Sequence, residues 1–450
     1  MTHVLATPTG DDRADDVLDA IRTWNEKVPQ QDRQTKYCKM ASAPLVFYRG
    51  TNHLFWAKFA DDQRLSCFGS PETRTWLQGD LHAYNFGAYH NNKDEIVYDL
   101  NDFDEAIIAD YQYDLWRMAV SLVLIARQNG DLSARQQGKV IDAFVESYLY
   151  TLKAYRNKKR ADKIYFTQKN TAGKLHDFLK SVEKTYNYKG MLKRWAPKKK
   201  NGKRRLKKKG KLSKVSPEER DMILEAMVSY RKRLNDSLAK DKDYFKVKAV
   251  AHRLQAGTGS LGTPRYYVLI EGTKSGTHDD RILDVKLQSR PTAYTYLGKQ
   301  AQNEYDAQFE HEAHRHAEAY RALTRHTDRH LGWMILDDGS YSVRERSPYK
   351  EAFPGEALDT RTSFSKLAEQ WAEILATDHT RANKALPEQI YQRTNKRYPA
   401  FRDLVREVAF EYAREVEADW RSFVAALEID LDACGKQAFT LPSYKNLLPR

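Results

Sequence analysis

The sequence predicts an α+β protein with two lobes. Strand-like segments separated by a glycine-rich turn, at residues 247–288, lie between long stretches with helical periodicity. Short aromatic and β-branched segments broken by turn residues fill positions 44–110. The chain has 450 residues, which is more than one small module needs and enough for a large core. A sheet-containing lobe beside a helical lobe is therefore the expected architecture.

The first half of the chain is expected to be largely helical after an initial strand-rich part. Residues 1–43 are polar and predict an edge helix or a mobile arm. The segments PLVFYRG, HLFWAKFA, TRTWLQG and EIVYDLNDF have the composition of strands. Apolar residues then recur every three or four positions, which is typical of buried helix faces. Helices are expected at 114–127, 134–156 and 217–240, so residues 44–245 are assigned to the helical lobe.

Residues 246–350 are expected to form the glycine-rich β-lobe. Three strands, KAVAHRL, RYYVLIEG and RILDVKLQ, surround the glycine turn, and a helix is predicted at about 299–330. A hairpin follows, with Trp333–Leu336 and Tyr341–Arg346 as its strands and DDG at its turn. Residues 351–450 carry an amphipathic pattern and are expected to complete the helical lobe.

The net charge of +14 comes almost entirely from one tract. Residues 193–214 hold 13 Lys or Arg and no acidic residue. Such a tract predicts either a patch that binds an anionic partner or a solvated, flexible insertion that the fold does not need. The rest of the protein is nearly neutral, so nucleic-acid binding is an alternative function that depends on this tract alone.

Several classes of protein are not expected. The amino terminus lacks a basic segment followed by an apolar one, and no apolar run approaches the ~20 residues of a membrane span. Three widely spaced cysteines are too few for a dense disulfide framework. We therefore expect a cytoplasmic protein with no membrane contact.

The strongest chemical signal is GDLHAYNFG at 79–87, followed after a strand by NDFDEA. Asp80 and Asn85 share one predicted loop, and Asp102 follows the next strand. Phosphoryl transfer needs a carboxylate beside the attacking hydroxyl and oxygen ligands for magnesium. These three residues supply both. The alternative is that Asp80 and Asn85 only cap a turn.

Three motifs in order carry a resemblance to a known superfamily. GDLHAYN resembles the catalytic loop of aminoglycoside and choline phosphotransferases, which belong to the protein-kinase-like superfamily. NDFDEA resembles their metal-binding segment, and YQYDLWRMA at 111–119 resembles the helix that follows it. The combination also looks like an uncharacterised bacterial family of unknown function assigned to that superfamily.

The resemblance implies roles for individual residues. Asp80 would be the catalytic base, and Asn85 and Asp102 would hold Mg²⁺, with Asp104 as a further ligand. Asp114 would brace the catalytic loop, and His82 would support it. The superfamily's first loop histidine is replaced by Gln78, which leaves the tether made by that histidine in question.

A second constellation resembles the nucleotide-covering part of a kinase. Gly257, Gly259 and Gly262 form a GxGxxG pattern followed by Pro264 and a strand. A dinucleotide-binding fold would instead require a helix there. Lys286, in the next strand, resembles the kinase lysine that reaches the phosphates, although an ordinary exposed strand lysine has the same pattern. On the helix that follows, helical periodicity selects Glu312 as its acidic partner.

The order of the two constellations is the reverse of that in kinases. The simplest explanation is a circularly permuted kinase-like fold, and the alternative is that one constellation is accidental. The expected function is an ATP- and Mg²⁺-dependent phosphotransferase acting on a hydroxyl of a small-molecule acceptor. A nucleotide-binding pseudokinase and a nucleotidyltransferase are alternatives with the same fold, and the sequence does not predict an oligomeric state.

Overall fold

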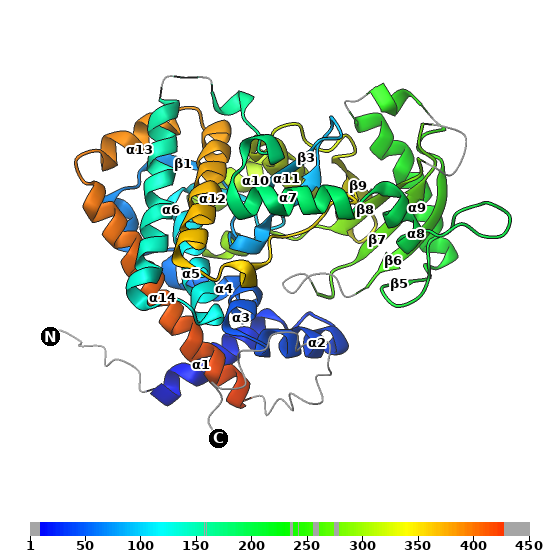
Figure 1. Ribbon diagram of the computed structural model, residues 1–450. Coiled ribbons are helices and arrows are strands. Elements are labelled where there is room, and N and C mark those ends of the chain that lie inside the picture. Colours follow the sequence, from blue (N-terminus) through cyan, green and yellow to red (C-terminus); the bar gives the residue numbers. More distant parts are fainter. Residues whose placement is uncertain are drawn as a thin grey trace.

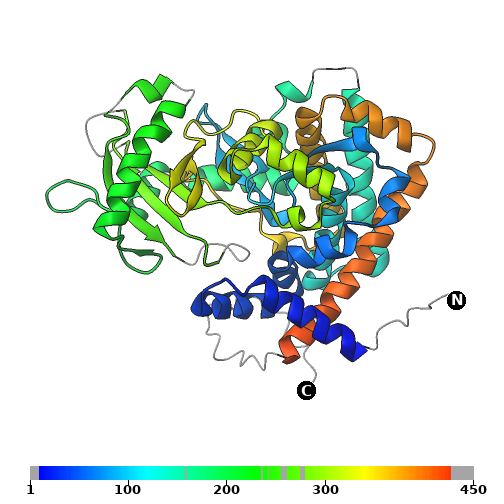
Figure 2. The ribbon, with the colours of Figure 1, turned by 180° about the vertical axis from the view of Figure 1, so that it is seen from behind.

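The computed structural model describes residues 10–426, except 157, 159, 235–236, 242, 255–260 and 274–278. It is a mixed α+β structure, which confirms the predicted fold class at that level. A helical region and an antiparallel sheet lie side by side in Figures 1 and 2, with α1 (Gly10–Trp24) and α2 (Gln30–Ala41) below them.

The sheet has six antiparallel strands in the order β5–β6–β7–β8–β10–β9. Along β7, side chains alternate between two clusters of buried residues, with Val268 in one cluster and Leu269 in the other. Both faces of the sheet are therefore covered. The strands are β5 (Leu212–Ser213), β6 (Val247–Arg253), β7 (Arg265–Ile270), β8 (Arg281–Leu287), β9 (Gly332–Leu336) and β10 (Gly339–Glu345).

Two helices from the expected helical lobe pack on this sheet. Helix α9 (Pro217–Arg233) buries Ile223 and Tyr230 in the cluster that includes Val268. It begins with a capping box between Ser216 and Glu219, and the proline stands at its first position. Helix α8 (Tyr188–Trp195) belongs to the cluster on the opposite face.

The helical region is assembled around α5 (Gln112–Asn129), in which almost every residue is buried. The predicted amphipathic stripe of the C-terminal helix is buried as well, at Phe401, Val408, Tyr412, Val416, Trp420 and Phe423. The other helices of this region are α6 (Ala134–Tyr155), α7 (Gly173–Thr185), α12 (Arg361–Ala382), α13 (Leu386–Thr394) and α14 (Tyr398–Ala426).

Two small antiparallel pairs position the motif segments. Strand β1 (Arg74–Leu77) pairs with β4 (Ile107–Asp110), and β2 (Phe86–His90) pairs with β3 (Ile96–Leu100). Short 3₁₀ helices occur at η1 (Gln63–Cys67), η2 (Pro71–Thr73), η3 (Ala83–Asn85), η4 (Ala161–Lys163), η5 (Gln168–Asn170), η6 (Ser237–Lys240), η7 (Thr292–Tyr296) and η8 (Gly355–Ala357).

The two segments PLVFYRG and HLFWAKFA are helices, so their prediction as strands is wrong. They form α3 (Pro44–Gly50) and α4 (Asn52–Phe59). In α4 the buried aromatic residues Phe55, Trp56 and Phe59 follow a helical spacing rather than the alternation of a strand. Proline at the first position of α3 favours a helix start.

The helix expected at 299–330 is two helices, α10 (Lys299–Gln308) and α11 (Glu312–Leu323). The break occurs because His311 is extended and caps α11, accepting a hydrogen bond from the backbone N–H of His314. Helix α9 likewise ends at Arg233, earlier than expected.

The basic tract at 193–214 is an ordered part of the sheet region, so its interpretation as a flexible insertion is wrong. Its apolar residues Trp195, Leu206 and Leu212 are buried against the sheet, and β5 pairs with β6. Trp195 packs edge-on against Tyr267, with ring centroids 5.2 Å apart. The tract is therefore anchored to the sheet region at Trp195, Leu206 and Leu212, with exposed lysines between these residues.

Replacing Trp195 with alanine is expected to lower the free energy of unfolding by about 3–5 kcal/mol, because a buried indole is removed. Lys200→Ala, at an exposed position of the same tract, is the control and should change it by less than about 0.5 kcal/mol. Urea unfolding followed by tryptophan fluorescence and circular dichroism measures both. Equal stabilities would contradict the packing role of the tract.

Among the described residues, no helix is both long enough and apolar enough to span a bilayer.

Cys67 is an exposed free thiol, whereas Cys38 is disulfide-bonded, which the sequence pattern did not predict.

Candidate functional site

A cleft of about 340 Å³ lies where the two motif segments meet strand β8 of the sheet. Residues from both predicted constellations line it, although they are far apart in the chain. They are Asp80, Asn85, Asp102, Asp104 and Lys286, together with Gln78 and His82.

The catalytic-loop segment begins with a turn that only glycine fits. Gly79, two residues after the end of β1, has a φ of +81°, and a Cβ there would overlap the carbonyl oxygen of Glu105. The Asp114 carboxylate accepts hydrogen bonds from the backbone N–H groups of Gln78 (2.7 Å) and Gly79 (3.1 Å). Asp114 therefore occupies the bracing position that the resemblance implies.

Two further buried side chains, linked by hydrogen bonds, hold the Asp114 carboxylate in place. His379 of α12 places Nε2 3.3 Å from Asp114 Oδ2, and Tyr148 of α6 places its hydroxyl 2.8 Å from His379 Nδ1. All three side chains are buried. The loop is thus fixed by contacts reaching into two helices of the helical region.

Gln78 connects the two motif segments. Its Nε2 donates to the carbonyl oxygen of Asp102 at 2.8 Å, and its Oε1 accepts from the backbone N–H of Asp80 at 2.9 Å. An amide side chain can donate and accept at the same time. Gln78 therefore provides a tether between the catalytic-loop segment and NDFDEA.

The Asp80 carboxylate is oriented by a buried arginine. Arg117, on α5, donates its Nε and Nη2 to Asp80 Oδ1, with the Nε contact at 2.9 Å. Asp80 Oδ2 lies 3.9 Å from His82 Nε2. Burial raises the pKa of Asp80 to about 7, although Arg117 opposes that shift and Glu105 adds to it.

His82 is buried, and Arg49 Nε lies 3.3 Å from its Nε2. Burial, with Arg49 and Arg117 nearby, lowers the pKa of His82 well below its usual value. His82 is therefore a neutral packed side chain beside the loop.

Strand pairing brings Asn85 to the segment that contains Asp102. Phe86 and Leu100 are partners in the β2–β3 pair, and the backbone N–H of Asn101 donates to the Asn85 carbonyl at 3.0 Å. Asn85 Nδ2 donates to the Asp80 carbonyl at 2.9 Å, which leaves Oδ1 as the amide atom available to a ligand.

Lys286 of β8 forms an ion pair with Asp104 across the cleft. Gln288 Nε2 donates to the same carboxylate at 3.1 Å, and His316 Nε2 is 3.9 Å from it. Burial alone would raise the pKa of Asp104, but the Lys286 ammonium outweighs it and holds the pKa well below its usual value.

Glu312 is not the partner of Lys286, so that assignment is wrong. Its carboxylate accepts hydrogen bonds from Tyr305 (2.5 Å) and from Arg315 Nε (3.0 Å). Arg315 follows three residues later on α11 and is fully buried, so it requires a carboxylate nearby. The acidic partner of Lys286 comes instead from the NDFDEA segment.

Arg315 is a site residue that the sequence did not indicate. Its guanidinium donates to carbonyl oxygens on both sides of the cleft, and its i,i+3 spacing from Glu312 is the one sequence signal that could have indicated it. The acceptors are Ala106 (2.8 Å), Asp104 (2.8 Å), Phe103 (3.1 Å) and Ser289 (3.3 Å).

Two of the three predicted loop glycines, Gly257 and Gly259, lie outside the described residues. Gly262 has a φ of +85°, and a Cβ there would lie 3.2 Å from Val28 and Pro29. Gly262 thus lies close to the segment between α1 and α2, and the neighbouring Thr263 lines the cleft.

These features define an α+β protein with an acidic cleft between a helical region and an antiparallel sheet. Residues 28–426 match the model of a family described as an uncharacterized protein conserved in bacteria (DUF2252), and the chain belongs to that family. No curated protein and no solved structure matches it.

Proposed function

We propose that this protein is an ATP- and Mg²⁺-dependent phosphotransferase that acts on a hydroxyl group of a small-molecule acceptor. The observation that carries the proposal is the meeting of Lys286 with Asp104, 182 residues away in sequence, in the cleft that also contains Asp80, Asn85 and Asp102. A magnesium–triphosphate needs a cation on one side and metal-binding oxygens on the other.

The oxygen donors suit Mg²⁺. Asn85 offers its amide oxygen, and within the described part of the chain the Asp102 carboxylate has no ion pair. Oxygen ligands from one or two carboxylates, with waters and phosphates, are what Mg²⁺ prefers. Asn85 and Asp102 would hold the ion, with Asp104 as a further ligand; bound Mg²⁺ would neutralise phosphate charge.

Asp80 would act as the base. Because Arg117 engages Oδ1, the other oxygen is free of that ion pair and can accept the proton of an acceptor hydroxyl. A pKa near 7 keeps a large fraction of the carboxyl ionised at neutral pH. Lys286 would orient the phosphates. On nucleotide binding, Lys286 would release Asp104 and bind phosphate oxygens instead, which would couple nucleotide binding to the NDFDEA segment.

We propose in addition that the fold is a circularly permuted kinase-like one. Three facts support this: the resemblance of the early motifs, a sheet later in the chain whose lysine faces them, and the packing of α11 on β9 and β10 beside that lysine. The turn containing Gly257, Gly259 and Gly262 would cover the phosphates.

Lys286→Met and Asp102→Ala test the proposal. Each is expected to weaken Mg²⁺-dependent ATP binding at least about tenfold, because Lys286→Met removes the cation beside the phosphates and Asp102→Ala removes a carboxylate that would hold Mg²⁺. Isothermal titration with ATP, with and without Mg²⁺, measures the effect. Lys366→Met, an exposed lysine on α12, is the matched control and should bind as wild type does.

The outcomes separate the alternatives. Unchanged ATP affinity in both variants would refute the assignment of the cleft. Tight binding without turnover would indicate a pseudokinase, and a target heavier by AMP rather than by phosphate would indicate nucleotidyl transfer.

The exposed lysines of the 193–214 tract support a second candidate, binding of an anionic partner. They are held on an ordered support, since Trp195 and Leu206 are buried beneath them. Binding of a polyanion through this tract would weaken steeply as the salt concentration rises.

A further inference from the structure

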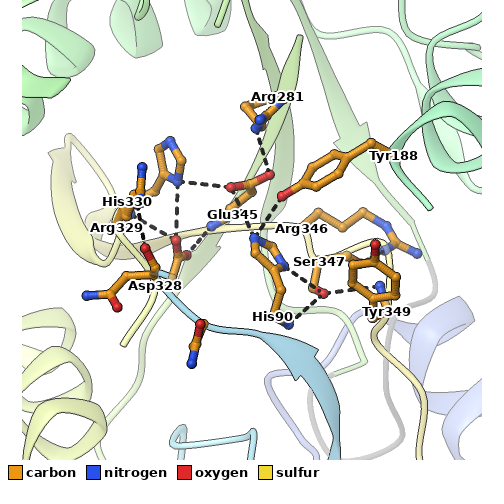
Figure 3. A network of polar contacts seen from close by, with 12 residues as sticks. His90, Tyr188, Arg281, Asp328, Arg329, His330, Glu345, Arg346, Ser347 and Tyr349 are labelled. Atoms are coloured by element: carbon orange, nitrogen blue, oxygen red, sulfur yellow. Dashed lines mark hydrogen bonds and ion pairs between the residues drawn. The ribbon is translucent and has the colours of Figure 1, made fainter. Parts of the chain in front are cut away.

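A second group of potential metal ligands lies away from the cleft, between the sheet and the β2–β3 hairpin. Asp328 and His330 precede β9, and Glu345 is the last residue of β10. Figure 3 shows their side chains pointing toward one another, with His90, the last residue of β2, beside them. None of these residues has a part in the proposed phosphotransferase site.

The ligand atoms are grouped closely. Asp328 Oδ1 and Glu345 Oε2 each lie 3.2 Å from His330 Nδ1, and the three ligand atoms lie within 4.8 Å of one another. His90 Nε2 is 3.4 Å from Glu345 Oε2. The side chains of His330 and Glu345 are only 2% and 4% exposed, so water screens them poorly.

These spacings suit a shared metal ion better than a set of direct hydrogen bonds. A tetrahedral ion with ligands at about 2.0–2.1 Å separates neighbouring ligand atoms by about 3.3–3.4 Å. Charge-assisted N–H···O bonds are shorter, at about 2.7–2.9 Å. If His330 Nδ1 carries a hydrogen, that N–H cannot point at both carboxylates at once. If Nδ1 carries no hydrogen, its lone pair can point at one ion between them.

Each candidate ligand has its remaining polar atom held by an outer partner. The Tyr244 hydroxyl lies 2.7 Å from His330 Nε2, and Ser347 Oγ lies 2.9 Å from His90 Nδ1. Arg281 Nε is 3.2 Å from Glu345 Oε1.

Asp328 Oδ2 accepts a hydrogen bond from the backbone N–H of Glu345. Outer partners of this kind fix the tautomer and direction of metal ligands. His330 Nδ1, Asp328 Oδ1 and Glu345 Oε2 face one another, and Asp328 Oδ1 also accepts a hydrogen bond from the backbone N–H of His330 at 2.9 Å.

We propose that Asp328, His330 and Glu345 bind a divalent transition metal, with His90 at the fourth position. A ligand set of two imidazole nitrogens and two carboxylate oxygens favours Zn²⁺. The Tyr188 hydroxyl lies 2.8 Å from His90 Nε2, so His90 binds the metal only when that hydrogen bond is given up. The ion would join β10 of the sheet to β2, the strand that follows the catalytic-loop segment.

Full-length protein stripped with a chelator and titrated with ZnCl₂ tests the proposal. We expect one equivalent of zinc to bind the wild-type protein. In His330→Ala the zinc affinity should fall at least about 100-fold, because loss of an outer partner alone costs about 10–100-fold and this variant loses a direct ligand. Tyr188→Phe should bind at least as tightly as wild type. His252→Ala, a histidine elsewhere on the sheet that pairs with Glu219, is the control and should not change the affinity.

Cobalt substitution provides a measurement that needs no variant. Bound Co²⁺ should give the intense visible absorption of a tetrahedral site, and excess Mg²⁺ should not displace it. Absence of stoichiometric zinc binding, an octahedral cobalt spectrum, or equal zinc affinity in wild type and a folded His330→Ala would each overturn the proposal. None of these results depends on ATP binding, so the fate of the phosphotransferase proposal is separate.

Discussion

Asp80→Asn is expected to reduce ATP turnover by about 10²–10⁴-fold while leaving Mg²⁺–ATP affinity within a few-fold of wild type. The reason is geometric: Asp80 Oδ2 is the oxygen not engaged by Arg117, whereas Asn85 and Asp102, which also line the cleft, would supply the metal ligands. Asparagine retains an oxygen that can accept from Arg117, so the guanidinium keeps a partner. Single-turnover release of phosphate, with water as the acceptor, measures the rate without knowledge of the natural acceptor.

Asp131→Asn, at an exposed position before α6, is the matched control and should turn over as wild type does. Thermal unfolding of both variants checks that they are folded. Turnover at the wild-type rate in folded Asp80→Asn would show that this carboxylate is not the base.

Arg315→Met is expected to lower the free energy of unfolding by about 3–5 kcal/mol. The substitution removes a fully buried guanidinium together with its hydrogen bonds to the carbonyls of Phe103, Asp104 and Ala106. Removing one partner from a buried charged network costs the desolvation of the groups left behind. Urea unfolding measures the effect.

Arg321→Met, on the exposed side of the same helix, is the control and should change stability by less than about 0.5 kcal/mol. If Arg315→Met does not fold, Arg315→Lys provides the comparison, because lysine keeps the charge but cannot reach all the carbonyls in one plane. A folded Arg315→Met within 1 kcal/mol of wild type would contradict the role of this residue.

Part of the site could be predicted because its chemistry is local in sequence. Asp80 and Asn85 share one turn, and Asp102 follows the adjacent strand, so spacing alone brought them near one another. Asp114 likewise lies in the motif that follows. In the structure Asp80, Asn85 and Asp102 line one cleft, and Asp114 accepts hydrogen bonds from the backbone of Gln78 and Gly79.

Residues that depend on tertiary contacts were missed or misassigned. Helical periodicity selected Glu312 for Lys286, but the carboxylate that reaches Lys286 comes from Asp104, on a different part of the fold. Arg315 donates to backbone carbonyl oxygens. Every residue has a backbone carbonyl, so the pattern of side chains in the sequence does not predict such contacts. Gln78 also makes its tether through backbone atoms of Asp80 and Asp102. The sequence alone therefore could not show whether glutamine at this position, where the superfamily has histidine, still connects the two segments.

The fold class was predicted from periodicity, but some elements were not. Segments dense in aromatic residues, such as HLFWAKFA, are buried on several sides and lose the contrast between polar and apolar faces that distinguishes helix from strand. In the basic tract, the 13 positive charges predicted a solvated segment, and the packing of its three buried apolar residues was therefore missed.

The pairing of Lys286 with Asp104 has a consequence for how the protein is made. At about 5–20 residues per second, the ribosome adds Lys286 roughly 10–40 s after Asp104, because 182 residues separate them. During that interval the acidic loop has neither its cation nor Arg315, which is synthesised later still. The cleft is therefore a late product of folding, and formation of the Lys286–Asp104 contact reports that the sheet has docked on the helical region.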